Sequence, residues 1–405
     1  MQLRSLLSLA LCGLALTGCV STPPPRSHMP AIEPAPPPPM DVPGTFDAYV
    51  DFPEWESAQV EPGLMALRRS CEGVLERNSR DYLSARATWA GRVEDWMPLC
   101  GGLAQVGDAA TARRVVEALT VPVEIVDPAG GARFTGYFEP MIEARRSPAG
   151  SYTAPVPGPP SDLVQTENGP MQRRANGSLR AYPARAQITP EPSRVLGYAH
   201  PADVFFLQIQ GSGRLHFPGG DTVRAAYYAH NGHPFRSTAN WLIEHGKISR
   251  GEASMQGIRA WMDRVSPAEA REAMNANPRY VFFQALPEGD AALGPNGAAN
   301  LPLTPLGSMA VDPDYHAYGV PFLISTTAPG LGGSWQGLLV AQDTGGAIKG
   351  PVRGDIYFGT GDGAGARAGT MNAPGRMWAL VPRAVANRLV AQEVASFLGE
   401  VRLAP

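Results

Sequence analysis

The last third of this 405-residue chain contains a series of short apolar runs separated by glycine-rich corners, with few helical stretches between them. Short runs bounded by glycine and proline are typical of β-strands. Many short strands with few intervening helices favour a closed β-barrel, so we expect a mainly β fold with flanking helices. The predicted strands of this region are 280–286, 319–326, 337–341, 355–358 and 377–381.

Helical periodicity is confined to the two flanks of the chain and to one internal region. Asp108 is a candidate N-cap, and Ser266 forms a capping-box pattern with Glu269, followed by Pro267 at the first helical position. Apolar residues recur with helical spacing in each of these segments. The predicted helices are 62–78, 108–118, 237–244, 254–265, 266–275 and 382–398.

The middle of the chain gives weaker signals. Segments 121–126, 132–138 and 203–210 have strand-like patterns. In the last of these, Gln208 and Gln210 would share one face beside a turn at Gly211 and Ser212, and their amides could bind sugar hydroxyls. The alternative is an ordinary polar strand edge. Segment 145–192 is rich in Pro, Gly and Arg and predicts surface loops, and 359–365 predicts a flexible loop.

The stretch 342–359 is the strongest candidate for a catalytic site. Asp343 and Asp355 stand on either side of a glycine-rich loop that carries Lys349 and Arg353. Loops held by a rigid scaffold often carry catalytic groups. Asp343-Thr344-Gly345 invites comparison with aspartic proteases, but such enzymes need two aspartates that share a proton, and the chain has no second triplet of this kind.

The N-terminus predicts export. Residues 1–19 have the pattern of a signal peptide, with Arg4, an apolar run that is too short to span a membrane, and a small-residue end. The end of this run, up to Cys19, resembles the bacterial lipobox, and Val20 favours the outer membrane by the same resemblance. The following segment, 20–44, contains ten prolines between residues 23 and 43, which predicts an extended tether of roughly 65 Å.

Composition limits the remaining possibilities. A net charge of -3 argues against a nucleic-acid partner. If Cys12 leaves with the signal and Cys19 carries a lipid, Cys71 and Cys100 remain as a pair in an oxidising compartment. We therefore predict a disulfide between them, with two buried free thiols as the alternative. The histidines lack ligand spacing, so neither a metal nor another cofactor is predicted.

Several motifs in order resemble the MltA family, membrane-bound lytic murein transglycosylases of Gram-negative bacteria, over residues 134–383. The resemblance implies a double-psi β-barrel (3D) catalytic domain from 45–140 plus 277–405, an inserted substrate-binding β-domain at 141–276, and a groove between them. The motifs are the three aspartates Asp312, Asp343 and Asp355, the segments 137–140, 205–213 and 231–235, and Gly294-Pro295-Asn296-Gly297.

The resemblance also implies roles for individual residues. Asp355 takes the place of the family's catalytic acid, while Asp343 either tunes the pKa of Asp355 or binds the sugar. The groove residues would be Thr135, Tyr137, Gln210, Gly211 and Ser212, with Asp312, Lys349 and Tyr357 in support.

The implied reaction cleaves the β-1,4 bond between N-acetylmuramic acid and N-acetylglucosamine of peptidoglycan and forms 1,6-anhydromuramic acid. A single aspartate acts first as acid and then as base. The implied enzyme class is a peptidoglycan lytic exotransglycosylase, a lyase that acts on polysaccharides, although the sequence leaves exo and endo cleavage open. A two-carboxylate muramidase and a non-catalytic peptidoglycan-binding lipoprotein are the alternatives. The implied location is the periplasmic face of the outer membrane, with cell-wall synthesis or divisome proteins as potential partners.

Overall fold

The computed structural model describes residues 40, 41, 49–167 and 169–392. The predicted signal peptide, Cys19 and most of the predicted tether lie outside these residues. Residues 40 and 41 of that segment form a short strand, β1 (Met40–Asp41), which pairs with β2 (Thr120–Ile125). Within the described part of the chain, every helix is too short or too polar to cross a membrane.

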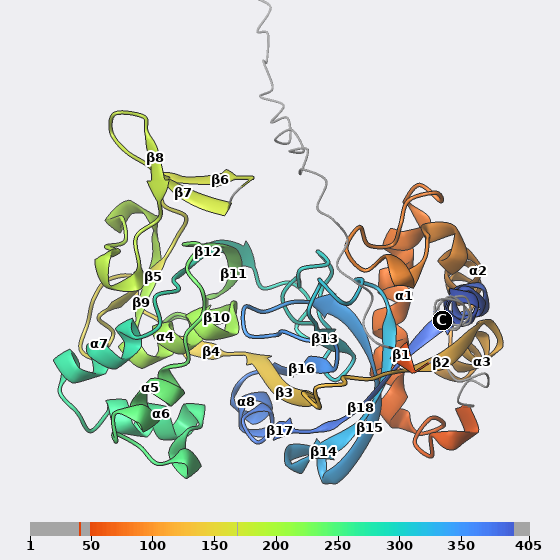
Figure 1. The fold of residues 1–405 in the computed structure, drawn as a ribbon. Coiled ribbons are helices and arrows are strands. Elements are labelled where there is room, and N and C mark those ends of the chain that lie inside the picture. Colours follow the sequence, from red (N-terminus) through yellow and green to blue (C-terminus); the bar gives the residue numbers. More distant parts are fainter. Residues whose placement is uncertain (1–39, 42–48, 168, 393–405) are drawn as a thin grey trace, which may run out of the picture. The chain divides into compact units, whose positions relative to one another are not determined.

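The largest sheet of the described chain has nine strands (Figure 1). Its hydrogen-bonded order is β1-β2-β18-β14-β15-β13-β16-β3-β17. The predicted strands of this region are confirmed with small shifts of their ends. The remaining members are β3 (Arg133–Glu139), β13 (Ser308–Ala310), β14 (Pro321–Ala328), β15 (Gly333–Asp343), β16 (Arg353–Thr360), β17 (Asn372–Ala373) and β18 (Gly375–Pro382).

This sheet rolls around an apolar core. Its two ends are β1 and β17, and the pairing of the described strands does not close into a ring. The sheet nevertheless curls back on itself, because only Pro374 separates β17, at one end of the order, from β18, which pairs with β2 and β14 near the other end. The Thr326 hydroxyl of β14 donates a 2.7 Å hydrogen bond to the carbonyl of Pro374. The structure therefore shows a mainly β fold with helices, and a closed double-psi barrel stays a prediction.

Three helices pack on this sheet near the N-terminal end of the described chain. They are α1 (Glu61–Leu75), α2 (Val93–Ala104) and α3 (Ala109–Leu119). The first and third confirm the predictions, and the Asp108 side chain caps α3 by accepting a hydrogen bond from the N–H of Thr111. Sequence reasoning missed α2, whose pattern is masked by Pro98 and two glycines.

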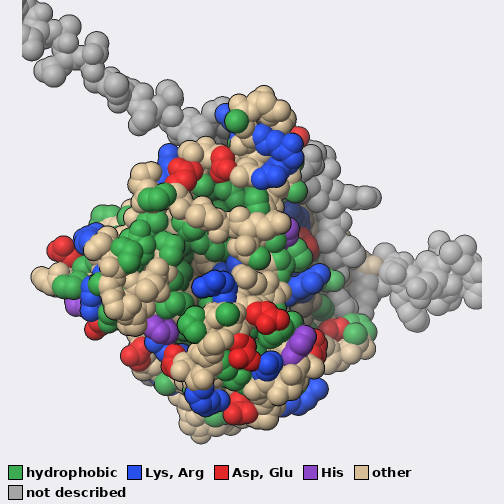
Figure 2. Space-filling view, turned by 90° about the vertical axis from the view of Figure 1, so that its left-hand side faces the viewer, with side chains coloured by type: hydrophobic (Ala, Val, Ile, Leu, Met, Phe, Trp, Pro, Cys, Tyr) green, Lys and Arg blue, Asp and Glu red, His purple; other side chains and the backbone are tan. Residues whose placement is uncertain are grey.

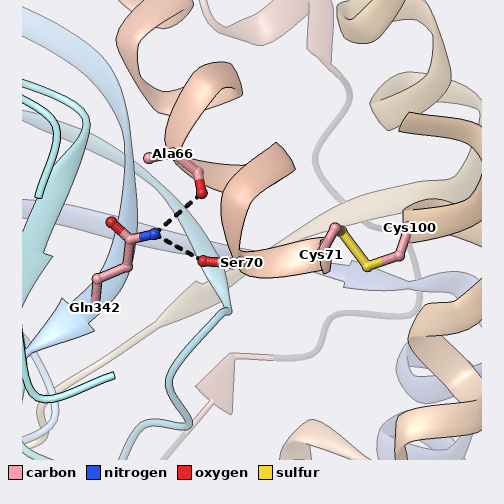
Figure 3. The surroundings of a disulfide bond; sticks show 5 residues. All are labelled: Ala66, Ser70, Cys71, Cys100 and Gln342. Carbon is pink, nitrogen blue, oxygen red and sulfur yellow. Dashed lines mark hydrogen bonds between the residues drawn. A yellow bond between two sulfur atoms is a disulfide. The ribbon is translucent and has the colours of Figure 1, made fainter. Parts of the chain in front are cut away.

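A disulfide joins Cys71 of α1 to Cys100 of α2, as Figure 3 shows. The same turn of α1 contacts the end of β15, where the fully buried Gln342 donates hydrogen bonds to the Ala66 carbonyl at 3.0 Å and to the Ser70 hydroxyl at 2.8 Å. Its side-chain oxygen accepts a hydrogen bond from Ser308 of β13. Helix α1 is thus tied to the strand end that carries Asp343.

A second, four-stranded sheet follows β3 in the chain and has the order β12-β11-β10-β4. Its strands are β4 (Met141–Glu143), β10 (Gly213–His216), β11 (Thr222–His230) and β12 (Val281–Pro287). Only Pro140 separates β3 of the larger sheet from β4 of this one. A buried cluster of ionic side chains holds the junction: Glu139 accepts hydrogen bonds from Arg214 at 2.9 Å and from Arg224 at 2.8 Å.

The prediction of surface loops across 145–192 is wrong in part. This segment contributes strands to two small sheets, which are held together by hydrogen bonds between backbones. The sequence contains no sign of these strands, because it shows no clear apolar alternation. The strands are β5 (Ala154–Pro157), β6 (Leu163–Thr166), β7 (Gly169–Arg173) and β8 (Leu179–Ala181), and β5 pairs with β9 (Val195–Ala199).

The predicted strand 203–210 is wrong, because it is helix α4 (Pro201–Gln210). Pro201 occupies the first turn, and Gly211 ends the helix with φ of 87°, in the left-handed region that favours glycine. Val204 and Leu207 belong to the core beneath the four-stranded sheet, whereas Phe205 faces a separate helical core. A helix buried on opposite sides is apolar all round, so its sequence shows no amphipathic stripe.

The helical core against α4 contains α5 (Thr238–Glu244), α6 (Met255–Met262) and α7 (Pro267–Asn275), which confirm the three predicted helices. The prediction of a flexible loop across 359–365 is wrong for its second half, where α8 (Asp362–Ala368) begins. Gly365 lets α8 approach β3, because an added Cβ would lie 2.7 Å from the ring of Phe138. Residues 383–392 are helical, and the rest of the predicted closing helix lies outside the described residues.

Candidate active site

Three neighbouring strands and the end of a fourth bring the candidate residues together. Ala310 of β13 is aligned with Asp355 of β16 on one side and with Asp343 of β15 on the other. Thr135 of β3 is aligned with Asp355 on the far side of β16. Side chains opposite one another on paired strands point to the same face of a sheet. The two aspartates therefore share a face, with backbones roughly 10 Å apart across two strand spacings.

Asp355 is partly buried and has a defined hydrogen-bond partner. The Thr135 hydroxyl donates a 2.5 Å hydrogen bond to Oδ1 of Asp355. That hydroxyl in turn accepts a 2.8 Å hydrogen bond from Nη2 of Arg353, which fixes the direction in which Thr135 donates. Burial raises the pKa of Asp355, and this effect outweighs the opposing influence of the Arg353 charge and the Thr135 hydrogen bond. Asp355 is thus disposed to hold a proton at a higher pH than an exposed aspartate.

Asp343 ends β15 and is held from two directions. Tyr137 donates a 2.8 Å hydrogen bond to Oδ2, and the backbone N–H of Ala298 donates one of 3.0 Å to Oδ1. Burial raises the pKa of Asp343, the hydrogen bonds from Tyr137 and the backbone oppose the rise, and the charge of Asp355 adds to it. Ala298 follows the Gly294–Gly297 motif directly, so the structure connects that motif to the site.

The loop between the aspartates is anchored by Asp312, the third aspartate of the predicted set. Asp312 is buried and accepts 3.0 Å hydrogen bonds from Nζ of Lys349 and from the N–H of Gly350. Next to it, Nε2 of the buried His316 lies 2.6 Å from the Pro351 carbonyl, and burial lowers the pKa of His316 to about 4. Asp312 and Lys349 therefore fix the course of the loop.

Tyr357 lies fully buried behind Tyr137, with ring centroids 5.3 Å apart. Its hydroxyl is 3.3 Å from that of Thr360, and an added Cβ on Gly294 would lie 2.4 Å from the same oxygen. Tyr357 thus packs between Tyr137 and the Gly294 loop. Because Tyr137 contacts Asp343, the position of Tyr357 supports the site from behind.

A cavity of about 330 Å³ opens over both aspartates. One wall comes from β3, β15, β16 and the loop after Asp343, and the opposite wall comes from the end of α4 and from β11 and β12. Its wall includes Thr135, Tyr137, Gln210 and Gly211 among the predicted residues, whereas Ser212, Asp312, Lys349 and Tyr357 lie outside it. The structure thus brings together most, but not all, of the predicted site residues.

Gln210 reaches the site from the end of a helix rather than from a strand. Its Oε1 accepts a 3.1 Å hydrogen bond from the N–H of Phe138 of β3. Gln208 also borders the cavity, although residues two apart on a helix point in different directions. It is buried, donates to the Val281 carbonyl at 3.1 Å and accepts from Arg185.

Sequence reasoning missed two polar residues of the cavity wall, Asn277 and Arg279. Both lie in the short connection between α7 and β12, which looked like an ordinary loop. The segment 231–235, which was singled out from the sequence, contributes Phe235 to the wall, and Tyr227 of β11 also lines it.

No cluster of three or more His, Cys, Asp or Glu side chains suited to a metal ion occurs among the described residues. The cavity wall instead combines two carboxyl groups, hydroxyls, amides and the guanidinium groups of Arg279 and Arg353. Such a set can transfer protons and hydrogen-bond hydroxyl-rich ligands without a metal's help. The absence of a cofactor stays a prediction.

Comparison with known proteins identifies the family to which this chain belongs. Residues 133–284 match the family model of the MltA specific insert domain, and residues 307–381 match that of the 3D domain. Membrane-bound lytic murein transglycosylase A of Escherichia coli (strain K12) is 35% identical over 268 residues, which span 64% of this chain and 68% of that protein. The chain belongs to the MltA family.

Solved structures agree with this assignment. A membrane-bound lytic murein transglycosylase from Agrobacterium tumefaciens is similar with a TM-score of 0.73 and 29% identity, over 85% of this chain and 98% of that one. Escherichia coli MltA with bound chitohexaose has a TM-score of 0.60 and 25% identity, over 86% of this chain and 96% of that one.

Proposed function

We propose that this chain is a lytic murein transglycosylase. It cleaves the β-1,4 bond between N-acetylmuramic acid and N-acetylglucosamine in peptidoglycan and leaves a 1,6-anhydromuramic acid end. The observation that carries the proposal is Asp355, a partly buried carboxyl group with a raised pKa in the wall of a cavity. Relatives named as lytic murein transglycosylases, and a family structure with bound chitohexaose, support the substrate class.

In the proposed mechanism Asp355 is the single proton carrier. Oδ1 of Asp355 accepts the hydrogen bond from Thr135, whereas Oδ2 has no protein hydrogen-bond partner among the described residues. Oδ2 is therefore the oxygen available to protonate the leaving oxygen. The carboxylate that results then takes a proton from the C6 hydroxyl of the muramic acid ring, which attacks C1 of the same sugar. The bond to the leaving sugar breaks, the internal ether forms, and water is not consumed.

Arg353 assists both states of Asp355. Its hydrogen bond to Thr135 fixes the donor direction before the reaction, and its positive charge stabilises the carboxylate once the proton has left. Asp343 has two proposed roles. It raises the pKa of Asp355 by charge repulsion, or it binds the sugar and supports the positive charge that develops at C1.

The domain organisation is part of the proposal. The catalytic domain is a double-psi barrel formed by 45–140 and 277–405, the insert is 141–276, and the glycan lies in a groove between them. The cavity walls from β3, β15 and β16 on one side and from α4 and β11 on the other support this arrangement. Because β12 pairs with β11, a second boundary after Pro287 fits the strand pairing better than one at residue 276.

The proposed location is the periplasmic face of the outer membrane, through a lipid on Cys19 and the tether 20–44. The sequence pattern of residues 1–44 supports this anchoring, and the names of the relatives support membrane association. Contacts with cell-wall synthesis or divisome proteins are proposed from the family resemblance alone.

Mass spectrometry of purified peptidoglycan after digestion tests the reaction. Fragments with anhydro ends, one water lighter than hydrolytic fragments, are expected from the parent chain. Asp355→Asn should be folded and release none, whereas Asp221→Asn, at an exposed aspartate that pairs with Arg146, should digest normally. Near-normal release of anhydro fragments by Asp355→Asn would show that the assignment of the acid is wrong.

The same digest separates the alternatives. Asp343 and Asp355 line one cavity, as a two-carboxylate muramidase also requires, and reducing ends without anhydro ends would establish hydrolysis. Binding to peptidoglycan without any released fragment would establish a non-catalytic lipoprotein.

A further inference from the structure

A second cavity, of about 590 Å³, lies within the insert region, separate from the catalytic cavity. Its walls come from β5, α4, α6, α7 and Tyr280, the residue before β12, and most of the lining side chains are apolar. Figure 2 looks onto the face on which α7 and β5 lie and shows hydrophobic side chains exposed among charged ones. Small-molecule sites commonly have volumes of about 300–1,000 Å³, apolar walls and a few placed polar groups.

Arg185 is the least exposed of the three charged side chains that line this cavity. Its guanidinium donates to the carbonyls of Asn277 at 3.0 Å and Arg279 at 2.6 Å, and to Oε1 of Gln208. A guanidinium has five N–H groups, so two remain after these three bonds. Among the described residues Arg185 forms no ion pair with a carboxylate, and burial lowers its pKa to about 10. An anion in the cavity would offset the cost of placing this charge in a partly buried position.

The surroundings of Arg185 are suited to a planar anion. The rings of Phe205 and Tyr280 each lie 5.2 Å from the guanidinium carbon, which holds the group in place. His200 also lines the cavity, and its buried Nδ1 has no hydrogen-bond partner in the described part of the chain. Arg271 adds an exposed positive charge at the rim, where Asp263 is an exposed carboxylate.

From this arrangement we infer that the cavity binds a carboxylate attached to a small apolar body. The carboxylate pairs with the two remaining N–H groups of Arg185 in the bidentate manner that guanidinium favours. The apolar body packs against Ala202, Val265, Ala270 and Met274. Gln208 lines both this cavity and the catalytic one, so an occupant here contacts a residue that also borders the catalytic cavity.

Two sources can supply such a carboxylate. One is the end of a peptide stem on the glycan, an assignment that rests on the proposed function. The other is a free short carboxylic acid or dipeptide in the periplasm. Both have the same recognition chemistry, and binding measurements on a chain that does not turn over substrate can separate them.

The test uses calorimetric titration of the full chain with N-acetyl-alanyl-alanine and with its C-terminal amide. The carboxylate should bind about tenfold or more tightly than the amide, the effect of one charge-assisted hydrogen bond. Arg185 also ties two backbone carbonyls, so the variant chosen is Arg271→Glu, which should weaken carboxylate binding about threefold or more. Arg264→Glu, an exposed arginine outside the cavity, is the matched control.

Asp355→Asn should bind the dipeptide as the parent chain does, so a failure of the proposed catalysis is distinguishable from a failure of this site. In that background, stem-bearing glycan fragments and the same fragments stripped of stems are compared. If Arg271→Glu weakens binding of the stem-bearing fragments but not of the stripped ones, the stem is the source. If Arg271→Glu weakens binding of the dipeptide and of neither kind of fragment, the source is a free acid. Equal binding of acid and amide, absence of dipeptide binding at millimolar concentration, or equal effects of both arginine variants would overturn the inference.

Discussion

The buried ionic cluster between the two sheets permits a quantitative prediction. Glu139 has no exposed surface, and it pairs with Arg214, which is 3% exposed, and with Arg224, which is 9% exposed. Its Oε2 also accepts a 2.9 Å hydrogen bond from the Thr360 hydroxyl. The hydrogen bonds to the side chain of Glu139 are therefore all donated to a carboxylate, and Glu139→Gln removes the charge while nearly keeping the shape.

The expected destabilisation follows from the contacts that glutamine cannot make. Its amide oxygen can replace one carboxylate oxygen, but its NH₂ group must then face a guanidinium that is also a donor. Arg214 keeps a 2.7 Å pair with the half-exposed Glu288, whereas Arg224 keeps only a bond to the Leu293 carbonyl and has no carboxylate left among the described residues. Breaking one partner of a buried ion pair costs about 3–5 kcal/mol, and this is the predicted fall in the free energy of unfolding.

Urea denaturation followed by circular dichroism measures this difference. Glu269→Gln is the control, because Glu269 pairs with Lys247 at a site where both side chains are about one-third exposed, and loss of such a pair costs about 1 kcal/mol or less. If Glu139→Gln were no more destabilising than Glu269→Gln, the cluster would not hold the sheets together as we argue.

Three further predictions concern the site and its support. Arg353→Gln removes a charge that lowers the pKa of Asp355, so the acid should stay protonated to higher pH. The alkaline limb of the pH profile of kcat/KM should therefore move to higher pH, and a move to lower pH would contradict the assignment. Gln342→Leu leaves buried polar partners unsatisfied, at about 1–3 kcal/mol for each, and should lower kcat together with the urea midpoint; an unchanged midpoint would argue against this support. Replacing Cys71 and Cys100 by serine should lower the free energy of unfolding by about 3–4 kcal/mol, from a sequence separation of 29 residues, and an unchanged thermal midpoint would refute this.

Local chemistry made part of the fold predictable. The helix that begins after Asp108 and the strand that ends at Asp343 carry their caps and apolar runs in contiguous sequence. Helix α4 has comparable local signals in Pro201 and Gly211, yet it was predicted as a strand. Its Val and Phe content favours strands, and packing between two cores removed the polar face that would have marked it as a helix.

The candidate site was likewise predictable from the sequence only in part. The spacing of Asp343 and Asp355 around a glycine-rich loop singled out both carboxyl groups, and the motif that contains Thr135 and Tyr137 was also visible. Their pairings were not, because Thr135 lies 220 residues from Asp355 in the chain and Tyr137 lies 206 from Asp343. The role of Arg353 likewise depends on the β3–β16 register.

The sequence by itself determined the mainly β character, most helices and the aspartates that carry the proposed chemistry, because these depend on neighbouring residues. Only the tertiary structure decided which oxygen of Asp355 is free, how Asp312 and Lys349 hold the loop, and that Arg185 borders a second cavity. These features depend on burial and on contacts between segments distant in sequence. Burial changes the free energy of a charged group by its solvation, and a sequence pattern does not contain that quantity.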